Sequence, residues 1–240
     1  MTAVTAVTAG PFGADPVPLA DFVTWSDWAL ARVGFRPSNA LALVGVCRDE
    51  LMHGFEREVA RTWGQPFAIG SLAGLVFVGR TGLQAALGHV PGEDGRHRLV
   101  AFCFPHIGID GHGTLGRVER RGRLRSTSAC GALASFRADL SDGRRDQRLD
   151  PDDLEQSLLR RRLDPLVGRG LVPTLATLTR LARQAAVADL SRYAGEVQTG
   201  EPVDIAYLSG IVVHGPAGRD GVVEVQAEVV IDGERIALEH

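Results

Sequence analysis

The chain has 240 residues, enough for one large domain, and 45% of them are hydrophobic, which supports a substantial core. Its net charge is −3, so a nucleic acid is not expected as the main partner. No apolar run reaches the roughly 18 residues that span a bilayer, and the N-terminus lacks the pattern of a signal peptide. Three cysteines do not make a disulfide framework. These features predict a cytoplasmic protein without a membrane partner.

The sequence divides into a tail, one domain and a short terminal remnant. Residues 1–17 repeat Thr-Ala-Val and then become rich in proline and glycine, which predicts a flexible N-terminal tail. Residues 18–237 are expected to form a single α/β domain. Residues 238–240 read Leu-Glu-His and resemble the start of a purification tag, so His240 is excluded from any functional role.

The first elements alternate between helix and strand. Aromatic residues at helical spacing predict an amphipathic helix over Leu19–Phe35. The apolar run Ala40–Val46 is typical of a buried parallel strand, and a period of about 3.6 residues from Leu51 to Trp63 predicts a helix after it. Further strands are predicted over 75–78, 98–104, 203–213 and 222–231, and further helices over 81–87, 132–140, 152–162 and 174–193.

This order predicts a mixed α/β domain with a helical insertion late in the chain, interpreted as a dimer contact or a lid. The glycines at 111, 113 and 116 match the spacing of a dinucleotide-binding loop, but that loop should open a helix. Here the short basic segment Arg117–Arg125 follows, which indicates a hairpin. We therefore reject nucleotide binding and expect the arginines of this segment to form a solvated face.

Three metal-binding residue types stand where a ligand site is expected. Cys47 and His106 each follow a predicted buried strand, and Cys130 stands at a glycine-flanked helix start. Because ligands bind at the carboxyl ends of strands in open α/β sheets, a zinc site is plausible. Two thiolates and one neutral imidazole would balance Zn²⁺ and leave a fourth position open, as in catalytic zinc sites. The alternative is that Cys47 and Cys130 are inert buried thiols, the role we assign to Cys103.

Two kinds of residue could assist such a metal. Asp49, held by the neighbouring Arg48, could accept a hydrogen bond from zinc-bound hydroxide; otherwise it is an ordinary helix N-terminal carboxylate. His89 and His214 follow apolar segments and could be orienting donors or proton relays. For His214, a hydrogen-bonded core histidine is the preferred interpretation.

Several motifs together resemble a known family. They are CRDE at Cys47–Glu50, GRTG at Gly79–Gly82, HVP at His89–Pro91, FPHIGID at Phe104–Asp110 and SACGAL at Ser128–Leu133. In this order they are similar to the limiting-CO2-inducible protein B/C family, also described as theta carbonic anhydrases and related to the β class. The resemblance covers the chain from about Ala40 to near His214.

The resemblance implies a β-carbonic-anhydrase-like mixed sheet flanked by helices, usually in a homodimer. It implies that Cys47, His106 and Cys130 hold Zn²⁺ and that Arg48 and Asp49 form a catalytic dyad. Further residues expected near the metal as orienting or proton-relay groups are His89, Arg80 and Asp110. The chain departs from the plain β class, where one residue separates Asp from Arg and the histidine lies close to the second cysteine.

The function expected from this resemblance is a lyase that hydrates CO2 to bicarbonate reversibly through zinc-bound hydroxide. Two alternatives stay open at this point. The protein could be a catalytically silent, zinc-stabilised scaffold that binds a protein partner, or Cys47 and Cys130 could form a redox switch that releases metal on oxidation.

Overall fold

The computed structural model describes residues 12–92, 94–197 and 199–239. Most of the expected N-terminal tail (residues 1–11) and His240 of the expected tag remnant lie outside the described residues. The strands are β1 Val17–Pro18, β2 Leu41–Val46, β3 Phe67–Ala68, β4 His97–Phe104, β5 His106–Gly108, β6 Arg117–Val118, β7 Thr127–Ser128, β8 Val203–His214, β9 Asp220–Ile231 and β10 Glu234–Ala237. The helices are α1 Leu19–Ala31, α2 His53–Trp63, α3 Gly79–Leu87, α4 Gly131–Ser141, α5 Leu154–Leu163 and α6 Leu175–Glu196.

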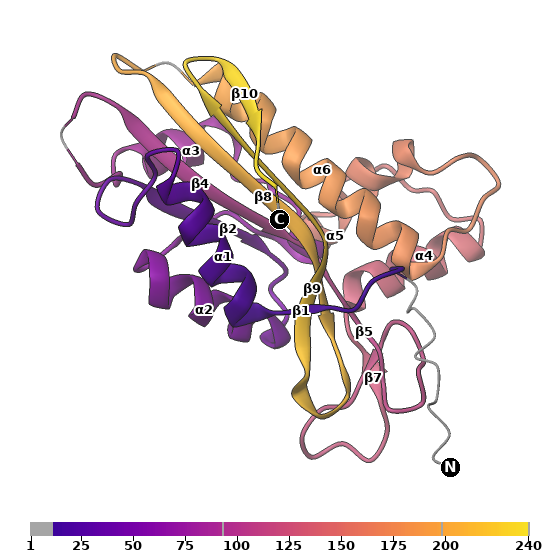
Figure 1. The fold of residues 1–240 in the computed structure, drawn as a ribbon. Coiled ribbons are helices and arrows are strands. Elements are labelled where there is room, and N and C mark those ends of the chain that lie inside the picture. Colours follow the sequence, from indigo (N-terminus) through magenta and orange to yellow (C-terminus); the bar gives the residue numbers. More distant parts are fainter. Residues whose placement is uncertain (1–11, 93, 198, 240) are drawn as a thin grey trace, which may run out of the picture.

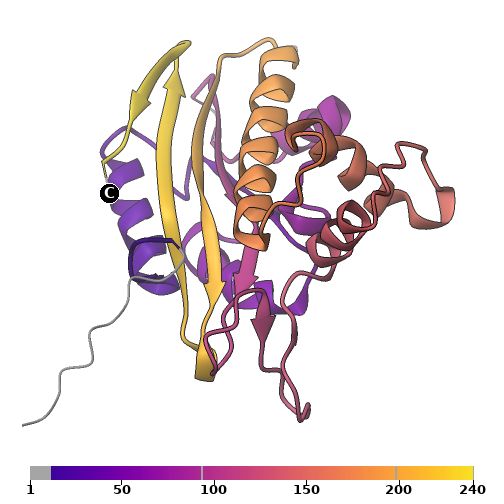
Figure 2. The ribbon, with the colours of Figure 1, turned by 90° about the vertical axis from the view of Figure 1, so that its right-hand side faces the viewer.

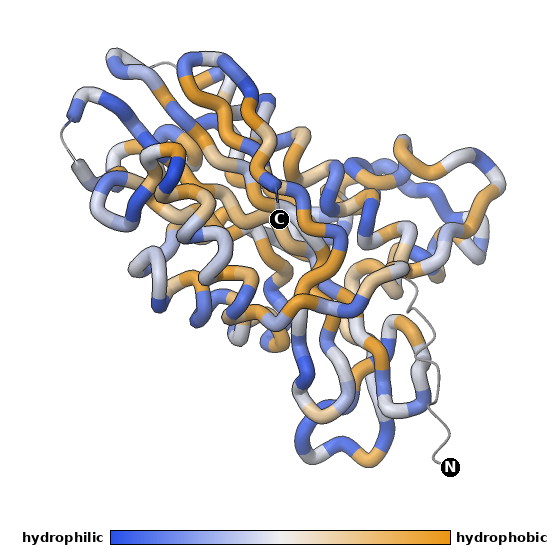
Figure 3. Tube along the Cα trace, in the orientation of Figure 1, coloured by the Kyte–Doolittle hydropathy of each residue, from blue (hydrophilic) through white to orange (hydrophobic). Residues whose placement is uncertain are grey.

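One mixed sheet organises the described part of the chain (Figure 1). Its strand order is β1-β9-β8-β4-β2-β3, with β5 beside β8 and β10 beside β9. Strands β2, β4 and β8 run parallel, and β9 returns antiparallel to β8. The parallel strands are buried on both faces, which explains why their sequences are almost continuously apolar. Figure 3 shows hydrophobic residues gathered along these central strands, with hydrophilic residues at the outer loops.

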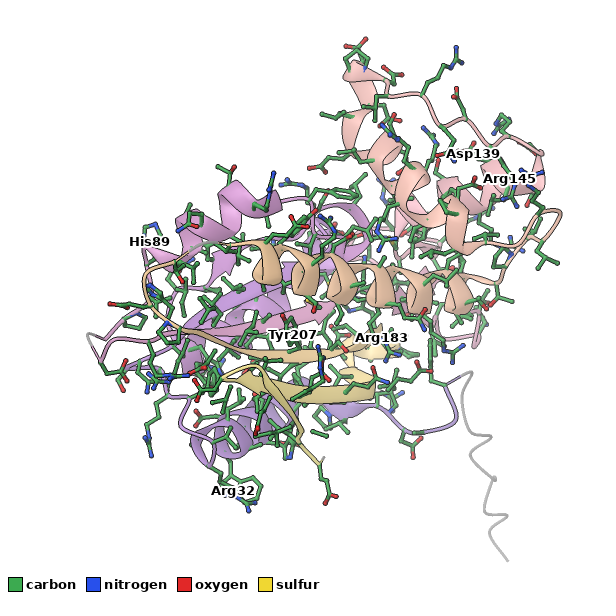
Figure 4. All side chains as sticks on the ribbon, turned by 90° about the horizontal axis from the view of Figure 1, so that it is seen from above. Arg32, His89, Asp139, Arg145, Arg183 and Tyr207 are labelled. Atoms are coloured by element: carbon green, nitrogen blue, oxygen red, sulfur yellow. The ribbon has the colours of Figure 1, made fainter. Side chains whose placement is uncertain are left out.

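Helices cover both faces of the sheet, as the β-carbonic-anhydrase-like α/β prediction requires. Phe22 of α1 and Phe55 of α2 pack with Phe102 and Phe104 of β4 on one face. Helices α3 and α6 pack against the other face. Figure 4 shows α6 on one side of the strands and Arg32, the residue after α1, on the other. Part of the predicted helical insertion is therefore a layer of the main domain.

The loop between β3 and α3 was predicted partly as a strand, and this was wrong. Residues 75–78 follow a 3-10 turn over Leu72–Gly74 and make one isolated bridge, between Gly70 and Val76. Leu75 and Val76 are apolar because they are buried and not because they pair in a ladder. A Cβ atom at Gly70 would lie 2.1 Å from the carbonyl oxygen of Val46, so only glycine lets this loop pass the end of β2.

The basic segment after the glycine-rich loop forms the predicted hairpin. Strands β6 and β7 pair antiparallel in a separate two-stranded sheet. Figure 2 shows this part of the chain extending beyond the carboxyl end of β4. Because β7 leads directly to Cys130 and α4, the hairpin lies next to the three predicted metal ligands. No helix among the described residues is both long and apolar enough to cross a bilayer.

Candidate metal centre

The structure brings the three predicted ligands together. Cys47 follows β2, His106 begins β5 after Pro105 has ended β4, and Cys130 is the residue before α4. Residues Val46 and Phe104 are neighbours at the carboxyl ends of the parallel pair β2 and β4, so the residues that follow them share one edge of the sheet. One ligand atom from each of Cys47, His106 and Cys130 lies within 4.8 Å of the other two. All three residues are buried.

The donor set and its unsatisfied atoms fit a metal such as zinc. The Nε2 atom of His106 is fully buried and has no hydrogen-bond partner. A buried polar atom without a partner is costly, and a metal ion at this nitrogen would satisfy it. Two sulfur atoms and one imidazole nitrogen are ligands that zinc prefers. The three residues would leave a fourth position for water or substrate.

The contact between the thiols of Cys47 and Cys130 shifts their pKa values in opposite directions. A hydrogen bond from Cys130, opposed by burial and aided by His106, lowers the pKa of Cys47 to about 4. The same interaction with Cys47, together with burial, raises the pKa of Cys130 well above its usual value. The backbone N–H of Ala73 also donates to the Cys47 sulfur at 3.3 Å. These contacts favour the thiolate at Cys47, and the thiolate is the form that binds metals.

Asp49 lies at the edge of this cluster. Its Oδ2 atom is 4.0 Å from Nε2 of His106. Arg120 of the β6–β7 hairpin donates from Nη2 to both carboxylate oxygens, at 3.0 and 3.1 Å, and from Nε to Glu50 at 2.6 Å. Burial raises the pKa of Asp49, and Arg120 opposes this rise. Arg120 also holds the pKa of Glu50 down at about 2, with help from Asp49.

Arg48 does not form the predicted dyad with Asp49. Its guanidinium pairs with Glu155 of α5, with Nη2 to Oε1 at 2.7 Å. Arg120 occupies the place that the sequence analysis gave to Arg48. The basic pattern of the hairpin predicted a solvated face, so the contact between Arg120 and Asp49 was not predicted. The one available signal was the position of the hairpin, which returns the chain to Cys130.

Arg80, His89 and Asp110, which were expected to assist the metal, have their observed contacts with residues outside the Cys47–His106–Cys130 cluster. The guanidinium of Arg80 pairs with Glu196 at 3.5 Å, and the ring of His89 lies against Phe67. Figure 4 shows His89 near the loops from which the parallel strands start, whereas Cys47 and His106 follow the carboxyl ends of β2 and β4. Asp110 accepts hydrogen bonds from the backbone of His112 and Thr114 and thereby stabilises a turn.

His214, predicted from sequence to be a hydrogen-bonded core histidine, contacts a predicted ligand. Its Nε2 atom lies 3.1 Å from Nδ1 of His106, and its Nδ1 atom lies 3.0 Å from Oδ2 of Asp220. The residue is buried and hydrogen-bonded, as that interpretation requires. Its partners, however, connect it to the candidate metal centre.

Comparisons with known proteins agree with this architecture. The solved structure of PtLCIB4, described as a homolog of the limiting CO2-inducible protein LCIB, matches with a TM-score of 0.79 and 25% identity, covering 94% of this chain and 96% of that one. The structure of LCIB itself matches with a TM-score of 0.74 and 24% identity, covering 93% of each chain. No curated protein matches the chain.

The family-level comparison covers nearly the whole domain. Residues 16–231 match the family described as limiting CO2-inducible proteins B/C beta carbonic anhydrases. The matched range contains the sheet, the three candidate ligands and the β6–β7 hairpin. The chain therefore belongs to the limiting CO2-inducible protein B/C family, with a β-carbonic-anhydrase-like α/β fold and a Cys-His-Cys cluster that could bind zinc.

Proposed function

We propose that this protein is a zinc-dependent carbonic anhydrase that interconverts CO2 and bicarbonate. The observation that carries the proposal is the buried Cys47–His106–Cys130 cluster with the unpartnered Nε2 atom of His106. Three ligands with an open fourth position are typical of catalytic zinc sites, whereas structural sites usually have four protein ligands. Membership of a family described as beta carbonic anhydrases supports the same reaction.

Cys47, His106 and Cys130 would hold the zinc. When bound, zinc supplies the Lewis acidity that lets a water molecule lose a proton near neutral pH. In this proposal Asp49 would accept a hydrogen bond from the attacking water, and the 4.0 Å distance between its carboxylate and Nε2 of His106 supports this role. This contact would orient a lone pair of the water toward CO2.

Arg120 has the supporting role in this proposal. Its two hydrogen bonds to Asp49 fix the rotamer of the carboxylate and favour its ionised form against the effect of burial. Arg48 and Glu155 instead border a hollow of about 340 Å³ that is also lined by apolar side chains, including those of Phe77 and Leu158. None of the three candidate ligands lines this hollow, and neither does Asp49.

The test is CO2 hydration by stopped flow on protein of measured zinc content. We expect about one zinc per chain, as one three-ligand site requires, and loss of both zinc and rate in Cys47→Ala. Asp49→Asn should keep the zinc and lose rate. Cys103→Ala is the matched control, because Cys103 is equally buried but lies outside the cluster.

A silent zinc-stabilised scaffold predicts another result. It would hold zinc in the wild type and hydrate CO2 no faster than buffer alone. That outcome would refute the enzyme and leave the zinc site intact. The homodimer and the cytoplasmic location expected from the sequence stay predictions, and light scattering of the purified protein tests the first of them.

A further inference from the structure

A buried pair of histidines lies behind the candidate metal centre. The rings of His106 and His214 are nearly perpendicular, with centroids 5.2 Å apart and an interplanar angle of 77°. Both residues are almost completely inaccessible to solvent. The mechanism proposed above uses the Nε2 atom of His106 and leaves His214 and its partner Asp220 without a role.

The proton positions along this chain of contacts are constrained. A metal at Nε2 of His106 requires a lone pair there, so the neutral ring must carry its proton on Nδ1. Nδ1–H then donates to Nε2 of His214, which must be unprotonated. His214 consequently carries its proton on Nδ1, where it donates to the carboxylate of Asp220. Only an acceptor at the end of the chain allows this set of tautomers.

The sheet builds this arrangement into the fold. Strand β5 pairs with β8 so that Gly108 is opposite His214, which places His106 on the same part of β8. Strand β9 pairs with β8 so that Asp220 is directly opposite His214. The tight connection over Pro216–Gly218 closes this hairpin. All three side chains are therefore held by backbone pairing and not by flexible loops.

We propose that His214 and Asp220 are positioning residues that fix the tautomer and ring orientation of His106 for a zinc-class metal ion. The proposal rests on the zinc site of the proposed function. Histidine ligands in metalloproteins usually donate their second N–H to a carboxylate or another acceptor, and loss of that acceptor typically weakens metal binding 10–100-fold. Here the acceptor is a second histidine, and the carboxylate acts through it.

The sharpest variant is Asp220→Asn. Its amide can donate to Nδ1 of His214, which would place the His214 proton on Nε2, facing Nδ1 of His106. The proton of His106 would then be driven to Nε2, where it opposes the metal. Asp220 is partly exposed and lines a hollow of about 530 Å³, so the isosteric change disturbs little packing. His214→Phe, which keeps a ring but removes both nitrogens, is the second variant.

Zinc affinity is measured by competition with a chelator, and the His106 tautomer by ¹⁵N NMR of zinc-free and zinc-loaded protein. We expect both variants to bind zinc 10–100-fold more weakly, and Asp220→Asn to shift the His106 proton toward Nε2 in the folded, zinc-free protein. Asp232→Asn is the matched control, since that exposed carboxylate pairs with Arg96 away from the cluster, and it should match the wild type.

The outcomes separate this inference from the proposed function. Unchanged zinc affinity and an unchanged His106 tautomer in Asp220→Asn would overturn the positioning role, whatever the hydration rate. A wild type that binds zinc but hydrates no CO2 would refute the enzyme and leave the positioning role standing. If the wild type binds no zinc, both the proposed function and this inference fail.

Discussion

Replacing Arg120 with methionine tests the arrangement around Asp49 most directly. Methionine keeps most of the length of the side chain and removes the guanidinium. The variant loses two hydrogen bonds to Asp49, one to the hydroxyl of Thr127 and one to each of the carbonyl oxygens of Ser128 and Ala129, all at partly buried positions. A hydrogen bond to a charged group contributes about 1.5–3 kcal/mol to the free energy of unfolding, and the contributions of neighbouring bonds do not add up. The contact with Glu50 is largely exposed and adds about 0–1 kcal/mol.

From these contacts we expect Arg120→Met to lower the free energy of unfolding by about 2–3 kcal/mol. If about 2 kcal/mol of the same interaction orients Asp49 during catalysis, the hydration rate falls about thirtyfold. Arg48→Met is the matched control. Its ion pair with Glu155 is exposed, so its stability should change by at most about 1 kcal/mol.

Urea denaturation of the zinc-free proteins gives the stability, and stopped-flow hydration of the zinc-loaded proteins gives the rate. An equal loss of rate in Arg48→Met and Arg120→Met would contradict the supporting role of Arg120. Wild-type stability and rate in Arg120→Met would contradict it as well, because Asp49 would then need no partner.

Three further predictions concern packing, pH and metal. Gly70→Ala should cost about 3 kcal/mol or abolish folding, because its Cβ would meet the Val46 backbone; Gly200→Ala, with open space around it, should be near neutral in the same melting assay. Burial raises the pKa of Cys103 from 9.0 to about 12, so above pH 9 the unfolded state loses a proton that the folded state keeps. Stability should therefore fall there by up to about 1.4 kcal/mol per pH unit, and less steeply in Cys103→Ala; equal slopes would contradict this. Chelation should lower the melting temperature of the wild type and leave that of Cys47→Ala unchanged.

The residues of the candidate metal centre could be predicted from sequence because two local signals agree. Each apolar strand ends abruptly at a chemically distinctive residue, Cys47 or His106. Parallel neighbours in a sheet bring such ends to one edge, whatever the details of packing. The structure adds the strand register. Val46 lies opposite Phe104, and Cys47 and His106, which follow these residues, are therefore at the same edge of the sheet.

The partners of these residues could not be predicted in the same way. Arg48 is adjacent to Asp49 in sequence, yet the backbone after Cys47 turns its side chain toward Glu155 of α5. Arg120 reaches Asp49 because the β6–β7 hairpin folds back over the cluster, and its register is not encoded in a local pattern. Likewise, the segment 75–78 has the composition of a strand, but in the described structure it forms only an isolated bridge, between Gly70 and Val76.

The pairing of β5 with β8 has a consequence for the order in which the protein is made. His106 is synthesised 108 residues before His214, and Asp220 follows His214. Until β8 and β9 have formed, a growing chain contains the Cys47 and Cys130 thiols but lacks the His214 ring that, in our proposal, orients the imidazole of His106. Metal loading at full affinity is thus expected only after β8 and β9 have been synthesised.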